Sequence, residues 1–461
     1  MSVWRTEGFA QANGGGLAQA VGRSSIRIAQ AGILAASLVI AVGTAWALIR
    51  GGNDFAVFHH AARLVWEGRG REIYSNSPDR FLYAPGFAWV LSPFGALPRE
   101  LALSLWCFLK AGVLGAWFVA LARRVVRSYS GVENALFVRS WIRSLGFGLA
   151  CLSLFYLARP VLIDFTYGQV NLLLLVVAWY ALAAHLEESP ESNSRGPLIR
   201  DGVLWLLLGF CAVVKLFPLL LAPVPWLVRS GKSKPKLWTE RISFLVGGGI
   251  ALGIPAVTIG FPGLFQLLLD WKAALIARGF PLESHNQSVP ALIEHWFSGR
   301  STAVMALGGQ SINTTFWMVP EQMRWAAARA WSLLSVGLLF SLYIQSSIRD
   351  SMRWIALVLG LVVLPSHLVW KPYFVFGLPL AFELVRHSVL RFGAAFAVWV
   401  IFLFVAINLS GFDWVGHKWG AIFEASGILL WGHLATWATV AFLTPCAFQG
   451  LANSSPRGLS R

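Results

Sequence analysis

The sequence predicts an all-α protein, a polytopic bundle of about 12 spans, because apolar runs recur along nearly the whole chain and about 20 apolar residues cross a bilayer. Of the 461 residues, 57% are hydrophobic and 13% are charged. A soluble domain usually has roughly 25% charged residues. The composition therefore indicates an integral membrane protein without a separate soluble domain.

The apolar runs set the order of the expected helices. We expect spans near residues 28–49, 101–122, 144–158, 170–185, 202–214, 216–229, 242–260, 326–345, 354–369, 373–385, 392–409 and 426–444. They form one transmembrane domain, residues 28–445, with tails at 1–27 and 446–461. Segment 2–22 lacks the charged, apolar and cleavage regions of a signal peptide, so we interpret it as part of a cytoplasmic tail.

Basic residues indicate how the chain is oriented. The formal net charge is +16, and the arginines and lysines cluster in short loops, which the positive-inside rule assigns to the cytoplasm. The strongest clusters are Arg123, Arg124, Arg127, Arg139 and Arg143, then Arg229, Lys232, Lys234, Lys236 and Arg241, then Arg349 and Arg353. This orientation explains the charge without a nucleic-acid partner. It places both termini in the cytoplasm and loops 50–100, 261–325 and 411–420 outside.

Two apolar segments need separate interpretation. The stretch "FLYAPGFAWVLSPFGALP", residues 81–98, is interrupted by three prolines. A full crossing there would also put the basic cluster that follows outside, so we expect a partly inserted outer hairpin or juxtamembrane helix. Residues 202–229 must cross the membrane an even number of times, because the loops on both sides of this stretch are assigned to the cytoplasm. This predicts an unusually short helix pair with Lys215 and Pro218 near its outer turn.

The first outer loop begins with "NDFAVFHHAARLVWEGRGREIY", residues 53–74. Apolar residues fall on one side and His59, Arg63 and Glu67 at four-residue spacing on the other, with Gly68 as the stop, which predicts an amphipathic helix at the outer interface. Asp54 precedes this pattern. It is either an N-cap that accepts backbone N–H bonds or a general base at the water-lipid boundary.

Polar residues interrupt two other apolar runs. "LIDFTYGQVNLLLL", residues 162–175, contains Asp164, Tyr167, Gln169 and Asn171, which must face protein, water or ligand, or else cap and bridge helices. Lys215, in "AVVKLFP", either extends to the interface or binds a phosphate group.

Two outer-face motifs come later. "ESHNQSVPALIEHW", residues 283–296, groups His285, Asn286 and Gln287 before a short helix that ends near Trp296. "LPSHLVWKPYF", residues 364–374, contains His367 and Lys371, four residues apart. His367 is either a structural histidine or one half of a clamp for an anionic head group.

The sequence contains no Walker loop, no GxGxxG motif in a strand context, no HExxH and no CxxC. Its four cysteines lie within apolar runs and indicate no redox or metal role. We therefore expect neither a metal nor a cofactor. Without a domain for a soluble activated donor, the pattern favours a lipid-linked substrate.

Taken in order, five motifs resemble those of glycosyltransferase family 87, polyprenol-phosphate-sugar-dependent enzymes of the GT-C class. They are "NDFAVFHHAARLVWEGRGREIY", "FLYAPGFAWVLSPFGALP", "GQVNLLLL", "GFCAVVKLFPLLL" and "NQSVPALI". The similarity spans roughly residues 50–380. At "LPSHLVWKPYF" the family commonly has a Trp before the His, where this chain has Ser366.

The resemblance implies a GT-C bundle in a bacterial inner membrane, with its active site outside and Asp54 as the catalytic residue. It implies transfer of mannose or arabinofuranose, with inversion, from a polyprenyl phosphate to a glycolipid or polysaccharide acceptor. The expected donor-phosphate ligands are Lys371, His367, Arg80 and Lys215. The expected sugar or acceptor contacts are His59, His60, Gln169, Asn171, Asn286 and Gln287. The alternative is a transporter or flippase of a lipid-linked glycan, although such proteins usually show internal repeats and polar residues at the bilayer midplane.

Overall fold

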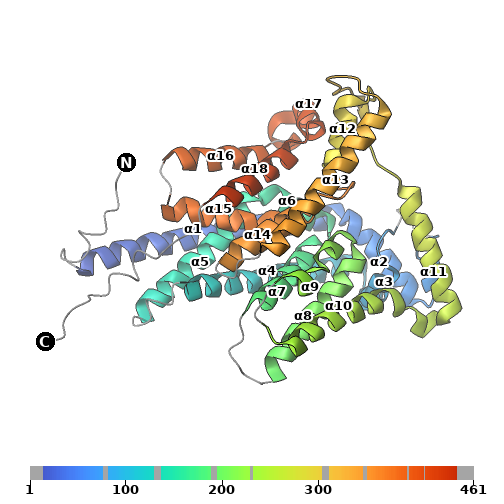
Figure 1. Ribbon diagram of the computed structural model, residues 1–461, viewed down its shortest axis with the longest axis horizontal. Coiled ribbons are helices and arrows are strands. Elements are labelled where there is room, and N and C mark those ends of the chain that lie inside the picture. The colour runs from blue at the N-terminus through green and yellow to red at the C-terminus, as the bar shows by residue number, and fades with distance from the viewer. Residues whose placement is uncertain are drawn as a thin grey trace.

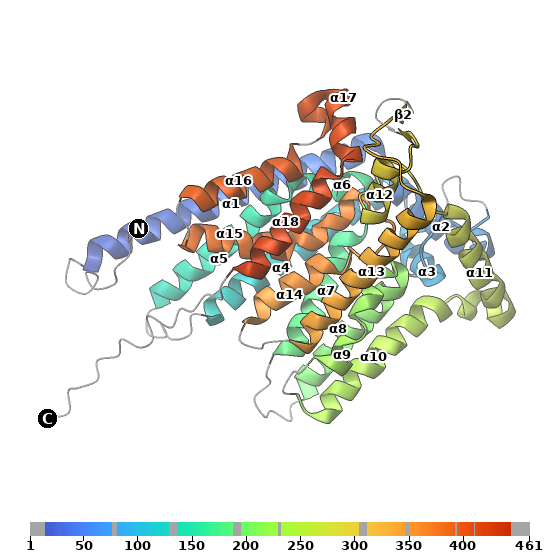
Figure 2. The same ribbon diagram turned by 45° about the horizontal axis from the view of Figure 1, so that its top comes forward.

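The computed structural model describes residues 14–75, 81–128, 136–187, 195–228, 232–303, 311–345, 350–391, 394–409 and 411–443. This part of the chain is almost entirely helical, which confirms the predicted all-α class. Most of the long helices run side by side along one axis, and α2, α3, α11 and α12 lie together at one end (Figures 1 and 2). Helix α1 (Gly14–Arg50) begins before the predicted boundary at residue 27, and residues 1–13 and 444–461 lie outside the described part, so the predicted domain boundaries stay predictions.

The elements follow one another in a simple order. The long or intermediate helices are α1 (Gly14–Arg50), α4 (Arg99–Ser128), α5 (Leu136–Tyr156), α6 (Ala158–Tyr167), α7 (Asn171–Leu186), α8 (Arg195–Val214), α10 (Lys234–Gly253), α11 (Ala256–Arg278), α13 (Glu321–Ile344), α14 (Ser351–Leu361), α15 (Leu378–Arg391), α16 (Ala394–Asn408), α17 (Phe412–Ala425) and α18 (Ile428–Phe442). The connecting elements are α2 (Asn53–Trp66), η2 (Gly70–Glu72), α3 (Pro85–Gly95), η4 (Phe217–Leu221), α9 (Val224–Leu227), α12 (Val289–Phe297), the short antiparallel strands β1 (Thr302–Ala303) and β2 (Ser311–Ile312), and η7 (Lys371–Gly377).

Five helices in the described residues are long and apolar enough to cross a membrane. They are Ile26–Arg50, Arg99–Val126, Gly196–Val214, Ala256–Arg278 and Glu321–Ile344. Two bent pairs, α5 with α6 and α17 with α18, raise the number to seven if each pair is one span. The expected total of about 12 spans is not confirmed, because other apolar helices such as α7 and α14 are shorter than a crossing requires.

The second member of the predicted pair at 202–229 is not a regular helix. After α8 the chain turns at Lys215 and Leu216, where Leu216 has φ 38°. It returns through the 3₁₀ helix η4 and the single turn α9. Prolines at 218, 223 and 225 lack the N–H groups that a continuous helix would need, which explains this break. The turn itself lies at Lys215, as expected.

The expected span 242–260 and outer loop 261–325 were also wrong in detail. Helix α10 ends at Gly253, and α11 continues to Arg278 with a kink at Gly260, where φ is 71° and Pro262 follows. The segment we expected to be an outer loop therefore begins with 18 more residues of α11. The predicted short helix ending near Trp296 is confirmed as α12.

Helices α8 and α10 pack closely through glycines. A Cβ added to Gly247 would lie 2.8 Å from the carbonyl carbon of Leu206 and nearer still to its oxygen. A Cβ on Gly209 would meet the carbonyl of Phe244 in the same way. Small residues of this kind allow helix backbones to approach in membranes. The packing fixes α8, whose last residue precedes Lys215.

Helices α2 and α3 form a hairpin at the end of the bundle (Figure 2). Helix α3 has 11 residues, too few to cross a bilayer, in line with the prediction that 81–98 is not a full span. Helix α2 and its stop at Gly68, with φ 75°, are as expected from the sequence. Its amphipathic character and its location at a membrane interface stay predictions.

Candidate functional site

Lys215 lies among four polar side chains from three other segments of the chain. Its Nζ donates to Gln169 Oε1 at 3.0 Å and to Asn171 Oδ1 at 2.7 Å. The ammonium also lies 4.1 Å from the centre of the Tyr373 ring and 5.6 Å from that of Tyr83. Lys215 thus points toward buried partners, which does not agree with a side chain that only extends to the interface.

Gln169 and Asn171 are placed by the short connection between α6 and α7. Gly168, with φ 66°, closes α6, and Asn171 begins α7. Both amide side chains are fully buried, and the Tyr83 hydroxyl lies 3.4 Å from Gln169 Oε1. The residue that caps α7 is Val170, with no side-chain cap bond. The amides therefore serve the polar cluster and not the helix end.

Asp54 lies in the first turn of α2, next to this cluster. The helix begins at Asn53 and is preceded by Gly52 in the left-handed region, so the N-cap interpretation of Asp54 was wrong. Burial raises the pKa of Tyr83 and of Tyr373, and the Asp54 carboxylate raises both further. Burial lowers the pKa of Lys215 to about 7, against the opposing effect of the Asp54 charge. Asp54 is thus an electrostatic neighbour of all three side chains.

A buried ion pair lies behind the two amides. Lys110 of α4 and Asp164 of α6 are both fully buried, with Nζ 2.5 Å from Asp164 Oδ1. The same ammonium donates to the Asp164 carbonyl at 2.8 Å, and Asp164 Oδ2 accepts from Asn171 Nδ2 at 3.1 Å. The ion pair is therefore connected to Lys215 through Asn171.

A second charged group gathers around Glu424 of α17. This carboxylate forms ion pairs with Lys371 and, at 4.0 Å, with Arg159, and it accepts from Ser284 Oγ at 3.2 Å. Burial lowers the pKa of the adjacent His285 to about 4, and the charges of Lys371 and Arg159 add to this effect. His285 is neutral at pH 7 as a result, so it contributes a ring nitrogen and no charge.

Tyr373 connects the two groups. Asp54 raises its pKa and Arg278 lowers it, so both charges lie near this ring. Arg278 also lies 5.4 Å from the centre of the Trp370 ring, one residue before Lys371. Residues 370–373 therefore lie between the two groups: Tyr373 contacts Lys215, and Lys371 pairs with Glu424.

Asn286 and Gln287 lie next to this segment, Asn286 paired with Trp370 and Gln287 bonded to Glu424. Asn286 donates to the carbonyls of Pro281 and His367 and accepts from the N–H groups of Ser288 and Val369. These four bonds use its full capacity, so contact with a sugar would require breaking one of them. Gln287 donates to two carbonyls, those of Ser284 and Glu424. The amides thus order the loop that carries His285.

The remaining predicted residues are distributed differently. His59 is buried, with Nε2 3.0 Å from the Leu97 carbonyl, so it ties α2 to the end of the α3 hairpin and does not lie on an exposed polar side as expected. His60 is half-buried on the same helix. Arg80 lies outside the described residues.

His367, predicted to be either a structural histidine or half of a clamp with Lys371, lies in different surroundings from that lysine. His367 is exposed in an irregular segment with its ring 6.4 Å from that of Phe280, whereas Lys371 is buried at the start of η7. A four-residue spacing aligns side chains only within an α-helix, and this segment is not one.

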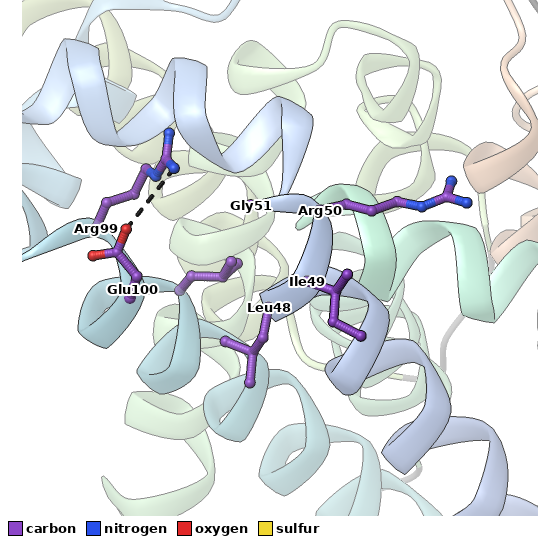
Figure 3. Close-up of a pocket in the computed structure, with 7 residues that line it drawn as sticks. Leu48, Ile49, Arg50, Gly51, Arg99 and Glu100 are labelled. Atoms are coloured by element: carbon purple, nitrogen blue, oxygen red, sulfur yellow. Dashed lines mark ion pairs between the residues drawn. The ribbon is translucent and has the colours of Figure 1, made fainter.

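A shallow cavity lies between the end of α1 and the start of α4. It is lined by Leu48, Ile49, Arg50, Gly51, Arg99, Glu100 and Leu103, with a volume of about 160 Å³. Arg99 pairs with Glu100 at 3.8 Å, and Arg50 points away from that pair (Figure 3). The two guanidinium groups therefore do not converge on one ligand position.

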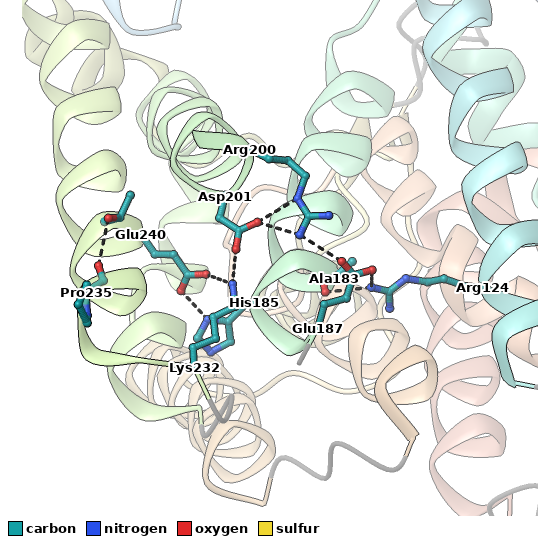
Figure 4. A network of polar contacts seen from close by, with 10 residues as sticks. Arg124, Ala183, His185, Glu187, Arg200, Asp201, Lys232, Pro235 and Glu240 are labelled. Atoms are coloured by element: carbon teal, nitrogen blue, oxygen red, sulfur yellow. Dashed lines mark hydrogen bonds and ion pairs between the residues drawn. The ribbon is translucent and has the colours of Figure 1, made fainter. Parts of the chain in front are cut away.

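The opposite end of α8 carries a charged network of another kind (Figure 4). Buried Lys232 lies 2.5 Å from Asp201 Oδ2 and 2.7 Å from Glu240 Oε1, and His185 Nδ1 lies 2.7 Å from Glu240 Oε2. Arg200 extends the network from Asp201 to Glu187. These pairs fasten α7, α8 and α10 together far along the helices from Lys215.

Sequence reasoning missed several members of the site. The missed residues are Tyr83, Lys110, Arg159, Arg278, Tyr373 and Glu424. A lysine inside the apolar run 101–122 was a detectable signal, because ionisable residues within a span are expensive and usually functional. The others lie near helix ends, where arginines and tyrosines are also common as interfacial anchors.

The fold and the site define a polytopic membrane protein with carboxylates, cations and amides gathered at one end of its helical bundle. A model described as glycosyltransferase family 87 matches residues 81–346, and the chain belongs to that family. This confirms the resemblance found in the sequence. The matched region contains Gln169, Asn171 and Lys215, whereas Asp54 and Lys371 lie outside it. No curated protein and no solved structure matches the chain significantly.

Proposed function

We propose that this glycosyltransferase moves a sugar, mannose or arabinofuranose, from a polyprenyl-phosphate donor to a glycolipid or polysaccharide acceptor. The observation that carries the proposal is the position of the Lys215 ammonium, 5.6 Å from the centre of the Tyr83 ring just before α3, where the charge of Asp54 in α2 raises the pKa of that lysine. A carboxylate and a cation are the two groups that transfer from a lipid phosphate needs: one to receive a proton, one to stabilise the leaving group.

The proposed reaction is a single displacement. Asp54 accepts the proton of an acceptor hydroxyl while that oxygen bonds to the anomeric carbon of the donor sugar. The bond from that carbon to the phosphate oxygen breaks, and the lipid phosphate leaves from the opposite face with the electron pair. Attack opposite the leaving group inverts the anomeric configuration.

The departing phosphate needs cations and not a general acid, because its oxygen is a weak base. Lys215 is half-buried beside Asp54, and its ammonium would carry the larger part of this stabilisation. Lys371 is the second candidate, and a phosphate there would compete with Glu424. His367 and Arg80 are weaker candidates, one exposed and the other outside the described residues.

The buried amides support the same assignment. Gln169 and Asn171 use their carbonyl groups to hold Lys215, so we assign them to the donor side of the site. Neutral His285, whose Nδ1 is buried without a hydrogen bond from the described residues, is suited to contact a sugar or acceptor hydroxyl. His60 stays a candidate acceptor contact at the same end of α2.

The charge distribution supports the location. Basic connectors on one side favour a cytoplasmic position for that side and for both termini. The site would then face the outside of a bacterial plasma membrane. A lipid-linked donor fits this position, since soluble nucleotide sugars are cytoplasmic.

The test uses the full-length protein in nanodiscs with radiolabelled polyprenyl-phosphate-mannose or polyprenyl-phosphate-arabinose and a glycolipid extract as acceptor. Asp54→Asn should lower transfer by about 100-fold or more, as loss of a general base does. Glu67→Gln makes the same chemical change at the exposed end of α2 and should leave transfer unchanged.

Transfer by Asp54→Asn at the wild-type rate would refute the assignment of the base. If wild type moves no label to an acceptor but carries the donor across the bilayer, the chain acts on its lipid as a transporter does.

A further inference from the structure

The charged side chain of Lys110 is completely buried and has no access to water. It lies in α4 with no exposed surface, paired with the equally buried Asp164 and 4.5 Å from the centre of the Phe165 ring. Replacing a buried ion pair by apolar residues often leaves stability unchanged or improves it, so such a pair is weak evidence for a stabilising role. Its connections to other residues are therefore the better guide to its role.

Hydrogen bonds connect the Lys110–Asp164 pair to Lys215 through Asn171. Asp164 Oδ2 accepts from Asn171 Nδ2 at 3.1 Å, and Asn171 Oδ1 accepts from Lys215 Nζ at 2.7 Å. A carboxylate can only accept and an ammonium can only donate, so just one orientation of the Asn171 amide satisfies both neighbours. The Lys110–Asp164 pair thereby fixes which end of Asn171 faces Lys215.

The balance of charges also indicates that Lys110 affects the position of Lys215. Two cations, Lys110 and Lys215, face two carboxylates, Asp164 and Asp54. Lys110 pairs with Asp164, so Lys215 is left with the charge of Asp54 and with the two amides that hold its ammonium. Without Lys110, two carboxylates would compete for Lys215, and the fully buried Asp164 would draw the ammonium back into the bundle.

We infer that Lys110 is a positioning residue that, through Asp164 and Asn171, holds the Lys215 ammonium toward the phosphate of the lipid donor. This inference rests on the proposed role of Lys215. The residue does not touch the donor and acts only through the chain of contacts to Lys215.

The test measures binding of sugar-free polyprenyl monophosphate to the full-length protein in nanodiscs between pH 6 and pH 9. Lys110→Met should weaken binding at least tenfold at pH 7. It should also shift the pH at which binding is lost to a higher value, because Lys110 lowers the pKa of Lys215 and Asp164 raises it. Asp54 also raises the pKa of Lys215, and the rings of Tyr83 and Tyr373 face its ammonium.

Two further variants distinguish this role from a general loss of structure. Adding Asp164→Asn to Lys110→Met removes the carboxylate that would draw Lys215 away, so the double variant should bind better than the single one. Lys232→Met removes another buried lysine, at the far end of α8, and should lower thermal stability without changing lipid-phosphate binding.

Lys215→Ala distinguishes a failure of the proposed phosphate role of Lys215 from a failure of the inference about Lys110. If that variant binds the lipid phosphate as wild type does, the proposed phosphate role of Lys215 is wrong, and the inference about Lys110 is wrong with it. If Lys215→Ala loses binding while Lys110→Met keeps both the affinity and the pH dependence of wild type, only the inference about Lys110 is overturned.

If Lys110→Met does not fold, the same binding measurement is made with Asn171→Leu. It breaks the link to Lys215 but leaves the ion pair intact. Because the probe has no sugar, any contact of Asn171 with a sugar cannot affect the result. Unchanged binding by this variant would overturn the inference, and a tenfold loss would support its step from Asn171 to Lys215.

Discussion

The glycines between α8 and α10 allow a prediction with an internal control. Gly247→Ala places a methyl group 2.8 Å from the carbonyl carbon of Leu206 and 3.0 Å from the backbone nitrogen of Phe210. These atoms belong to a helix backbone and cannot rotate away, so α8 and α10 must separate. Gly249→Ala makes the same change two residues later in α10, where no atom lies within 4 Å of the new methyl group.

The difference between the two variants isolates the steric cost. Alanine is favoured over glycine in a helix interior by about 1 kcal/mol, and this gain applies to both variants. Overpacking costs roughly 1–3 kcal/mol, and a clash with backbone belongs at the upper end of that range. We therefore expect Gly247→Ala to be less stable than Gly249→Ala by about 2–3 kcal/mol.

Thermal unfolding of both variants in the same detergent measures this difference, and donor KM measures its consequence for the site. Since α8 ends just before Lys215, Gly247→Ala should raise donor KM and Gly249→Ala should not. Equal Tm values for the two variants would contradict the packing described for α8 and α10.

Two more predictions concern charge. Because burial lowers the pKa of Lys215 to about 7 and a phosphate needs the charged form, donor affinity should fall as pH rises through about 7 in a binding titration; affinity constant up to pH 9 would contradict this. Lys232→Met leaves Asp201 and Glu240 buried without their shared cation. Arg200 and His185 still contact them, so we expect a loss at the lower end of the usual range, about 3 kcal/mol, in denaturant unfolding; an unchanged unfolding midpoint would argue against it.

The helical class and most helix positions could be predicted because apolar runs directly report burial or contact with lipid. Helices α6 and α17 were missed for a physical reason. Each packs at a sharp angle against a neighbouring helix, 74° for α6 and 61° for α17, so each resembles a loop or part of a longer run in the sequence. Helix α11 was missed because the expected span ended at residue 260, where the structure has a kink inside α11 and not the end of a helix.

Site residues could be predicted where a polar or charged residue interrupts an apolar run of the sequence. Lys215 and Asn171 were conspicuous because they interrupt apolar runs. Their partners Tyr83 and Tyr373 were not, because tyrosine is common at membrane interfaces. Spacing along the chain could not decide between the alternatives for His367 and Lys371, because a four-residue spacing aligns side chains only in an α-helix and this segment is not one.

The burial of Lys110 has a consequence for biogenesis. Its partner Asp164 lies 54 residues later in the chain, so α4 is synthesised well before the carboxylate that neutralises it. A lone lysine at the centre of an inserting helix costs about 2.5–3.5 kcal/mol. The apolar residues of α4 must therefore offset this cost during insertion, or α4 stays beside the insertion machinery until α6 has been synthesised. The order of synthesis and the order of stable insertion need not be the same in this protein.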